Sequence, residues 1–183
     1  MSDLTWTILR AALLTPWLAV LCAKDLKTRR LPNVWTLGGL ATGLALQAGW
    51  SGMSGFVDGL SAAGICILFL LIPFLVRAAG AGDLKMLAAC GAFVGMKSVL
   101  LLLLCVSFAG FFVAVGMLVT RKVGAARLKH AFRTLFDWRY DRKAGRAALP
   151  PKEDEGNRVP FGVAIAIGAV TTVGLELVMA VRV

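Results

Sequence analysis

Long apolar runs alternate with short polar stretches along this chain. Two of the runs, Phe56 to Val76 and Val99 to Val119, each hold 21 residues with at most one charged side chain. At about 1.5 Å per residue, either run forms a helix long enough to cross a hydrocarbon layer of about 30 Å. The pattern therefore predicts transmembrane helices and not amphipathic helices packed on a soluble core.

Four further segments are apolar but less uniform. They are Leu4 to Ala23, Val34 to Trp50, Leu84 to Met96 and Pro160 to Val181. Leu84 to Met96, the fourth of the six apolar segments in chain order, is too short to cross a bilayer comfortably. We expect an all-α, polytopic membrane protein with about six transmembrane helices, in which residues 1–183 form a single membrane-embedded domain.

Composition and charge support this class and add an orientation. Hydrophobic residues make up 58% of the 183 residues and charged residues only 16%, a balance typical of polytopic membrane proteins. In chain order, 16 of the 20 Lys and Arg residues fall in the loops that follow the first, third and fifth apolar runs, and Lys85 lies at the start of the fourth run, beside the second of these loops. By the positive-inside rule these loops are cytoplasmic, which places both termini outside. The net charge of +10 is then explained by topology, and no nucleic-acid partner is expected.

The largest share of this charge lies in one predicted cytoplasmic loop, at about 121–158. Eleven Lys or Arg residues fall between Arg121 and Arg158. Leu128, Phe132 and Leu135 recur among them at helical spacing, which predicts a basic amphipathic helix lying on an anionic lipid leaflet.

Four of the ten acidic residues lie near or within apolar segments: Asp25, Asp58, Asp83 and Glu176. Asp58 and Glu176 are close to the outer ends of predicted spans, where we expect their side chains to reach the membrane interface. Asp25 ends the first predicted helix and Asp83 begins the fourth. Because two spans separate them, both carboxylates reach the cytoplasmic face at similar depth, where they can meet.

Both aspartates have a local context that suits a site. In "GAGDLK", Gly80 and Gly82 remove side chains next to Asp83, which permits an extended peptide to approach the main chain. In "KDLKTRRLPN", Pro32 restricts the turn into the second helix, and Asn33 is a candidate cap of that helix.

The residues alone also allow a structural role for each of these groups. Asp83 can be the N-cap of a helix, and Asp25 can pair with Lys27 or Arg29. Lys85 can steady a developing oxyanion, or it can be one more positive charge that sets the topology.

No metal or other cofactor is predicted. The four cysteines form no C-x-x-C pair, and the single histidine, His130, has no partner at ligand spacing.

The combination of motifs resembles the type IV prepilin peptidases, the G-x-G-D class of intramembrane aspartic peptidases. The matching residues are Asp25 with Arg29, Pro32 and Asn33 after it, Gly80, Gly82, Asp83 and Lys85, and "RVPFG" from Arg158 to Gly162. The resemblance implies that Asp25 and Asp83 are the catalytic pair and that the other matching residues support the site.

Within that family the chain looks like the small form, because it lacks an N-terminal cysteine-bearing segment associated with methylation. It is similar to the peptidases of tight-adherence (Flp) pilus systems. The resemblance implies an aspartic endopeptidase of the bacterial inner membrane, with prepilins and membrane lipid as partners, that cleaves a short basic leader on the cytoplasmic side. A preflagellin-type peptidase, a noncatalytic membrane assembly component and a small transporter are the alternatives, and the oligomeric state stays open.

Overall fold

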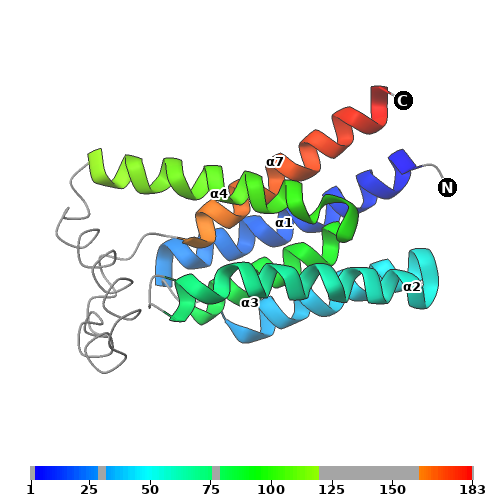
Figure 1. The fold of residues 1–183 in the computed structure, drawn as a ribbon, viewed down its shortest axis with the longest axis horizontal. Helices are drawn as coiled ribbons and strands as arrows, with labels where there is room; N and C mark the ends of the chain where they lie inside the picture. The colour runs from blue at the N-terminus through cyan, green and yellow to red at the C-terminus, as the bar shows by residue number, and fades with distance from the viewer. Residues whose placement is uncertain (1–2, 29–31, 76–78, 120–160, 183) are drawn as a thin grey trace.

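Five α-helices make up the part of the chain that the computed structural model describes, which is residues 3–28, 32–75, 79–119 and 161–182. The helices are α1 (Asp3–Thr28), α2 (Asn33–Leu75), α3 (Ala81–Val94), α4 (Met96–Val119) and α7 (Phe161–Arg182), shown in Figure 1. The described ranges contain no β-strand. The all-α prediction is therefore confirmed for these ranges.

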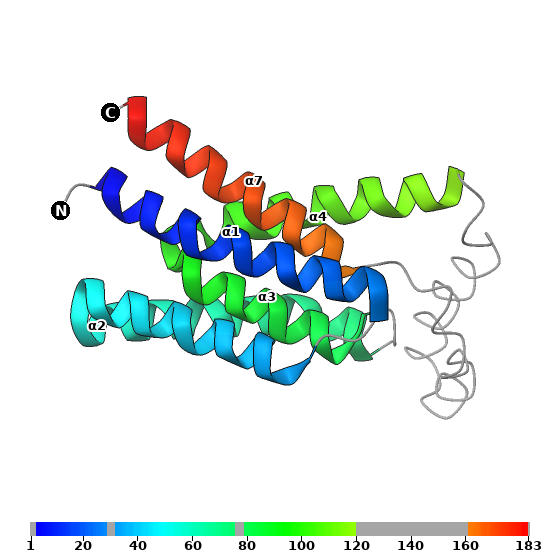
Figure 2. The same cartoon turned by 180° about the vertical axis from the view of Figure 1, so that it is seen from behind.

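Helix α2 is a hairpin of two antiparallel arms, residues 33–50 and 53–75 (Figure 2). A straight helix of its 43 residues would extend about 65 Å, roughly twice the thickness of a bilayer core. The chain reverses at Ser51 and Gly52, and Gly52 has φ 64°, in the left-handed region that glycine tolerates best. The two arms correspond to the predicted runs Val34 to Trp50 and Phe56 to Val76.

Helix α3 lies at the centre of the bundle. All nine residues from Met86 to Val94 are buried, and the helix contacts α1, α2, α4 and α7. A helix that is apolar on every side is expected where neighbours surround it. The 14 residues of α3 extend only about 21 Å. The short fourth segment is therefore a helix surrounded by protein from Met86 to Val94, with its polar first turn at the Asp25 end of the bundle.

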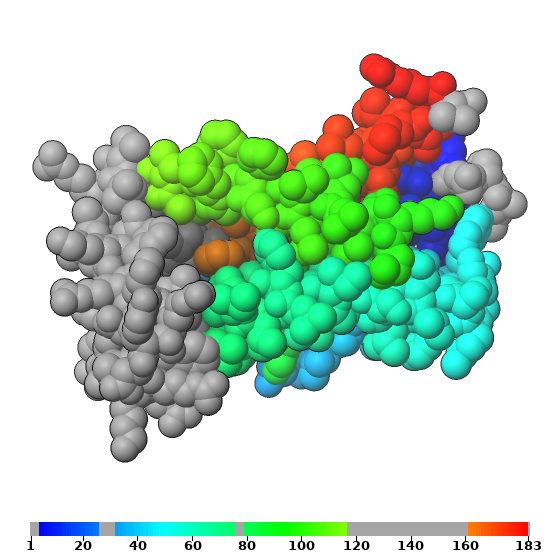
Figure 3. All heavy atoms as spheres, viewed as in Figure 1, coloured from blue at the N-terminus to red at the C-terminus, as the bar shows by residue number. Residues whose placement is uncertain are grey.

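Four of the described helices, α1, α2, α4 and α7, are long and apolar enough to cross a membrane, judged by length and composition. Helix α4 forms much of the face seen in Figure 3 and exposes large apolar side chains, among them Leu100, Phe108 and Phe112. Exposed side chains of this kind suit contact with lipid. The number of crossings, six, and the outside position of the termini stay predictions.

The helices define two ends of the bundle (Figures 1 and 2). At the Asp25 end, α1 and α4 finish, both arms of α2 have their outer ends, and α3 and α7 begin. At the Arg10 end lie the chain termini, the bend of α2 and the junction of α3 with α4. Asp25 and Asp83 are on the last turn of α1 and the first turn of α3, so the fold brings both to the Asp25 end.

Candidate active site

Asp25 packs against the start of α7. Its side chain is half-buried, and a Cβ atom on Gly162, the second residue of α7, would lie 2.6 Å from Oδ2 and 3.1 Å from Cγ of Asp25. Real Cβ atoms are essentially never found so close to another heavy atom, so any side chain at position 162 would require the Asp25 carboxylate to move. Gly162 belongs to the "RVPFG" segment. The sequence showed that this segment resembles a family motif. It did not predict the contact with Asp25, because the motif does not indicate which residue the start of α7 packs against.

Asp83 folds back on the backbone that precedes its helix. The Gly80 N–H donates a hydrogen bond of 2.9 Å to Oδ2 of Asp83, which is the third residue of α3. Gly80 is extended, with φ −86° and ψ 158°. A carboxylate in the first turn of a helix is stabilised by the unsatisfied N–H groups there. The N-cap of α3 is Gly80, so the N-cap role that the sequence allowed for Asp83 is wrong; its carboxylate instead accepts from the backbone N–H of the N-cap residue.

A hydrogen bond joins the two motifs across helices. Lys85 Nζ donates to Asn33 Oδ1 at 2.8 Å, which ties the first turn of α3 to the first residue of α2. Neither of the roles considered for Lys85 included this contact. The prediction that Asn33 caps α2 is wrong, because the carbonyl oxygen of Pro32 accepts the N–H groups of Trp35 and Thr36. The Asn33 side chain is instead the acceptor for Lys85.

Aromatic contacts hold the end of α1 against the start of α2. The Nζ atom of Lys24 lies 4.8 Å from the centroid of the Trp35 ring. The Nε1–H of Trp17 donates a hydrogen bond of 3.0 Å to the carbonyl oxygen of Trp35. The Trp17 ring lies so close to Gly39 that a Cβ atom there would overlap it. These contacts join α1 to the first arm of α2, and spacing in the sequence did not reveal them.

Three predictions at this end fall on residues outside the described ranges. They are the position of Arg29, the basic loop at about 121–158 with its proposed amphipathic helix, and Arg158 of the "RVPFG" segment. Pairing of Asp25 with Lys27 or Arg29 likewise stays a prediction.

The other two acidic residues of the apolar segments, Asp58 and Glu176, lie at the Arg10 end. The environment of Glu176 differs from the one expected from the sequence. Glu176 was expected to reach the membrane interface, but its side chain is only 9% exposed and forms an ion pair of 3.2 Å with Arg10. The expectation is wrong because α7 packs against α1, which brings the two charges together inside the bundle. Asp58 accepts a hydrogen bond of 3.0 Å from the N–H of Met96 and so caps α4.

A model of the type IV leader peptidase family matches residues 12–115, more than half of the chain. The chain belongs to the type IV leader peptidase family. The matched range contains Asp25, the Lys85–Asn33 pair and Asp83. No curated protein and no solved structure gives a match.

Membership in this family confirms the resemblance drawn from the two motifs. It gives the chain the general role of a type IV leader peptidase, with prepilins as the implied substrates. Together with the four apolar helices, it identifies a membrane protein. The matched range ends before α7, so the contact of Gly162 with Asp25 is a feature of the fold that the match does not cover.

Proposed function

We propose that this leader peptidase is an aspartic endopeptidase in which Asp25 and Asp83 share one catalytic water. The observation that carries the proposal is their position: both lie within the family match and both come to the same end of the bundle, on helices α1 and α3 that contact each other. Each carboxylate also lies close to the backbone of a glycine, Asp25 at Gly162 and Asp83 at Gly80.

The chemistry follows from two carboxyl groups near one water. Both groups cannot ionise cheaply at short distance, so one stays protonated while the other is charged. The charged carboxylate takes a proton from water as the water oxygen attacks the scissile carbonyl carbon. The neutral carboxyl donates a hydrogen bond to the carbonyl oxygen and then supplies the proton that the leaving amine requires. The two groups act as one titrating unit.

The surrounding contacts suit this role. The Lys85–Asn33 hydrogen bond holds the start of α3 against the start of α2, and the Trp35 contacts hold the end of α1 there. Each aspartate is thereby carried by a helix end that is fixed to α2. A rigid frame favours catalysis, because a displacement of about 1 Å in a reacting group can cost about a hundredfold in rate.

The substrate proposed is a Flp-like type IV prepilin with a short basic leader, cleaved on the cytoplasmic side of the bacterial inner membrane. The distribution of Lys and Arg supports this side, since it places the loops at the Asp25 end in the cytoplasm. The similarity of the chain to peptidases of tight-adherence (Flp) pilus systems supports the Flp-like substrate class.

One experiment tests both the peptidase activity and the side of the membrane on which cleavage occurs. Inverted and right-side-out membrane vesicles that contain the chain would each be mixed with an Flp-like prepilin in the presence of EDTA, and the N-terminus of the product would be sequenced. We expect cleavage after the basic leader in inverted vesicles only. Cleavage from the opposite side would overturn the orientation, whereas loss of cleavage in EDTA with recovery on added zinc would overturn the aspartic mechanism.

A further inference from the structure

The two proposed catalytic aspartates belong to helices that pack against different neighbours. Helix α3, which carries Asp83, packs mainly against α2. Helix α1, which carries Asp25, packs mainly against α7, and α7 in turn packs against α4. Contacts between the α2–α3 pair and α1 are sparser. The distance between the two carboxylates therefore depends on how α1 is held against α2 and α3.

One side chain of α1, Trp17, contacts both α2 and α3. Its ring lies so close to Gly39 of α2 that a Cβ atom there would overlap it, and its Nε1–H donates to the Trp35 carbonyl oxygen at 3.0 Å. The centroid of the same ring lies 6.1 Å from that of Phe93, a buried residue of α3. The ring cannot move closer to the backbone of Gly39, and the directional hydrogen bond restricts its rotation. Trp17 therefore sets a spacing between helices.

The surface that Trp17 meets is closely packed. Gly39 and Gly43 are one turn apart on the first arm of α2, and both are buried. A Cβ atom at Gly43 would lie 3.0 Å from the backbone nitrogen of Phe93, so α2 and α3 approach each other closely at this level. Trp17 thus rests on two helices that are already packed together, and a movement of α1 away from α2 also moves it relative to α3.

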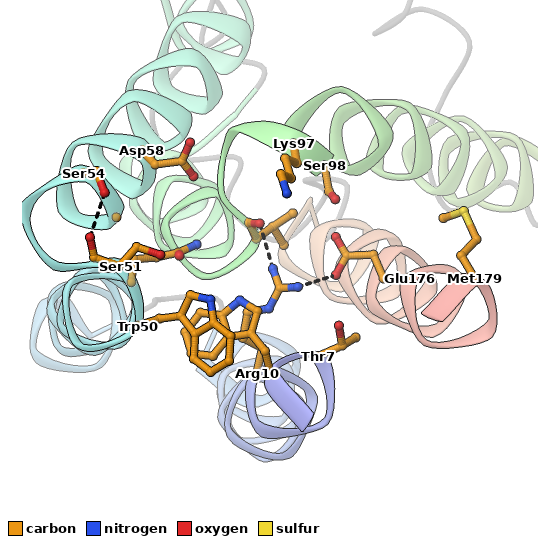
Figure 4. A pocket seen from close by; sticks show the side chains of 14 residues that line it. Thr7, Arg10, Trp50, Ser51, Ser54, Asp58, Lys97, Ser98, Glu176 and Met179 are labelled. Atoms are coloured by element: carbon orange, nitrogen blue, oxygen red, sulfur yellow. Dashed lines mark hydrogen bonds and ion pairs between the residues drawn. The ribbon is translucent and has the colours of Figure 1, made fainter. Parts of the chain in front are cut away.

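The place of Trp17 along α1 relates this contact to Asp25. Pro16, the residue before it, lies inside the helix and removes one of the backbone hydrogen bonds that stiffen α1. The part of α1 that carries Asp25 begins directly after this proline. A second aromatic contact joins α1 to α2 at the opposite end of the bundle, where Trp6 and Trp50 stack with their centroids 4.6 Å apart (Figure 4). That stack lies on the other side of Pro16, so it supports the other part of α1.

We propose that Trp17 is a positioning residue for the aspartate pair. Seated on Gly39, it holds α1 at the distance from α2 and α3 at which Asp25 and Asp83 share one water. This inference rests on the proposed aspartic mechanism. Trp17 acts through the placement of α1 and not through contact with the reacting groups. A shift of α1 by about 1 Å would misplace one carboxylate relative to the other and lower the rate by about a hundredfold.

The first test moves α1 by adding one methyl group. Prepilin cleavage is measured on the purified full-length chain, with kcat expressed per folded molecule. In Gly39→Ala the new methyl group overlaps the Trp17 ring, so kcat should fall by about ten- to a hundredfold. KM should change less, because the displaced carboxylates act in the chemical step. Gly38→Ala, the matched change one position earlier, meets no heavy atom within 4 Å and should keep its kcat. Equal kcat in the two variants would overturn the positioning role.

The second test removes the contact without creating an overlap, so it applies even if Gly39→Ala does not fold. Trp17→Leu loses the ring and the N–H donor, and its kcat per folded molecule should fall by about tenfold, equivalent to about 1.4 kcal/mol in the barrier. Trp6→Leu makes the same change in the aromatic contact at the opposite end. It should lower Tm while kcat per folded molecule stays near normal. Equal losses of kcat in the two variants would make Trp17 a general packing residue and contradict the assignment.

The double variant, Gly39→Ala with Trp17→Leu, decides whether the two residues act through each other. Leucine leaves room for the added methyl group, so the double variant should be no slower than Trp17→Leu alone. Losses that multiply would show that Gly39 acts by another route, and they would overturn the spacing role. The aspartic mechanism is tested separately by Asp25→Asn and Asp83→Asn. Normal cleavage in either of these would refute the catalytic pair, whatever the Trp17 variants do.

Discussion

At one end of the bundle Asp25 lies against Gly162 and Asp83 accepts a hydrogen bond from the Gly80 backbone, whereas at the other end Glu176 is buried against Arg10. The neighbours differ in kind. Glycine has no side chain, so the backbone of another segment can approach the carboxylate closely. Arginine neutralises a carboxylate and fills the space beside it.

The comparison shows that an acidic residue in an apolar segment is not by itself a sign of catalysis. Asp25, Asp83 and Glu176 each stand beside a long apolar run, and in the sequence only the motifs around Asp25 and Asp83 set these two apart. Their packing separates them further, because Glu176 is buried in an ion pair with Arg10, whereas Asp25 and Asp83 lie against the backbone of a glycine. Substitutions at the Asp25 end should therefore lower the turnover of the enzyme, and substitutions at the Arg10 end should lower its stability.

The largest effect is expected from the proposed catalytic pair. Asp25→Asn or Asp83→Asn should each lower the rate of leader cleavage by about 10²- to 10⁴-fold, because an amide cannot accept or supply the proton. The measurement is single-turnover cleavage of a prepilin by protein whose Tm is within the normal range. Asp58→Asn, at the Arg10 end, is the matched control and should retain cleavage. Near-normal turnover in either site variant would show that the pair is assigned wrongly.

The next effect concerns the ion pair at the Arg10 end. Arg10→Met leaves the Glu176 carboxylate buried without its cation and should lower the free energy of unfolding by about 3–5 kcal/mol. The double change Arg10→Met with Glu176→Met should recover most of this loss, because no charge is then buried. Thermal or chemical denaturation in detergent measures both. Cleavage per folded molecule should stay unchanged, and a specific loss of turnover would erase the distinction between the two ends.

A third prediction sharpens the contact between Asp25 and α7. In Gly162→Ala the new methyl group would lie within 2.6 Å of Asp25 Oδ2, so the carboxylate must move. A displacement of about 1 Å predicts a loss of about a hundredfold in kcat. Gly174→Ala on the same helix meets no heavy atom within 4 Å and serves as the control, with unchanged cleavage. Equal activity of the two variants would remove α7 from the site.

The smallest effect is expected from the link between the motifs. Lys85→Met removes the donor to Asn33 Oδ1, a partly exposed hydrogen bond worth about 1 kcal/mol. Cleavage should fall by roughly tenfold or less, which is the rate equivalent of about 1.4 kcal/mol. Asn33→Ala should lower it equally, and the double variant should be no worse than either single one. Additive losses would mean that Lys85 acts on the substrate and not through Asn33.

The helices themselves were predictable from the sequence. The runs Val99 to Val119 and Pro160 to Val181 differ from α4 and α7 by three residues or fewer at each end. Two separate runs anticipated the two arms of α2, with Gly52 at the bend. The short fourth segment became the central helix α3. This accuracy has a physical cause, since a chain in hydrocarbon must satisfy its backbone hydrogen bonds within each segment, and apolar length then marks each helix.

The partners of the functional side chains were not predictable. Lys85 meets Asn33 across 52 positions of sequence, Asp25 meets Gly162 and Arg10 meets Glu176. Each contact depends on which helices pack together and how each is rotated about its axis. A helix that is apolar on all sides, such as α4, gives little sign of its rotation.

What the sequence alone determined is therefore the membrane class, the helical segments and the two motifs that place the chain among the type IV leader peptidases. What only the tertiary structure decided is which carboxylate lies beside a glycine and which beside an arginine. The reason is that hydrophobicity specifies where each helix begins and ends through local hydrogen bonding, whereas the neighbours of a side chain depend on close packing between helices that are distant in the chain.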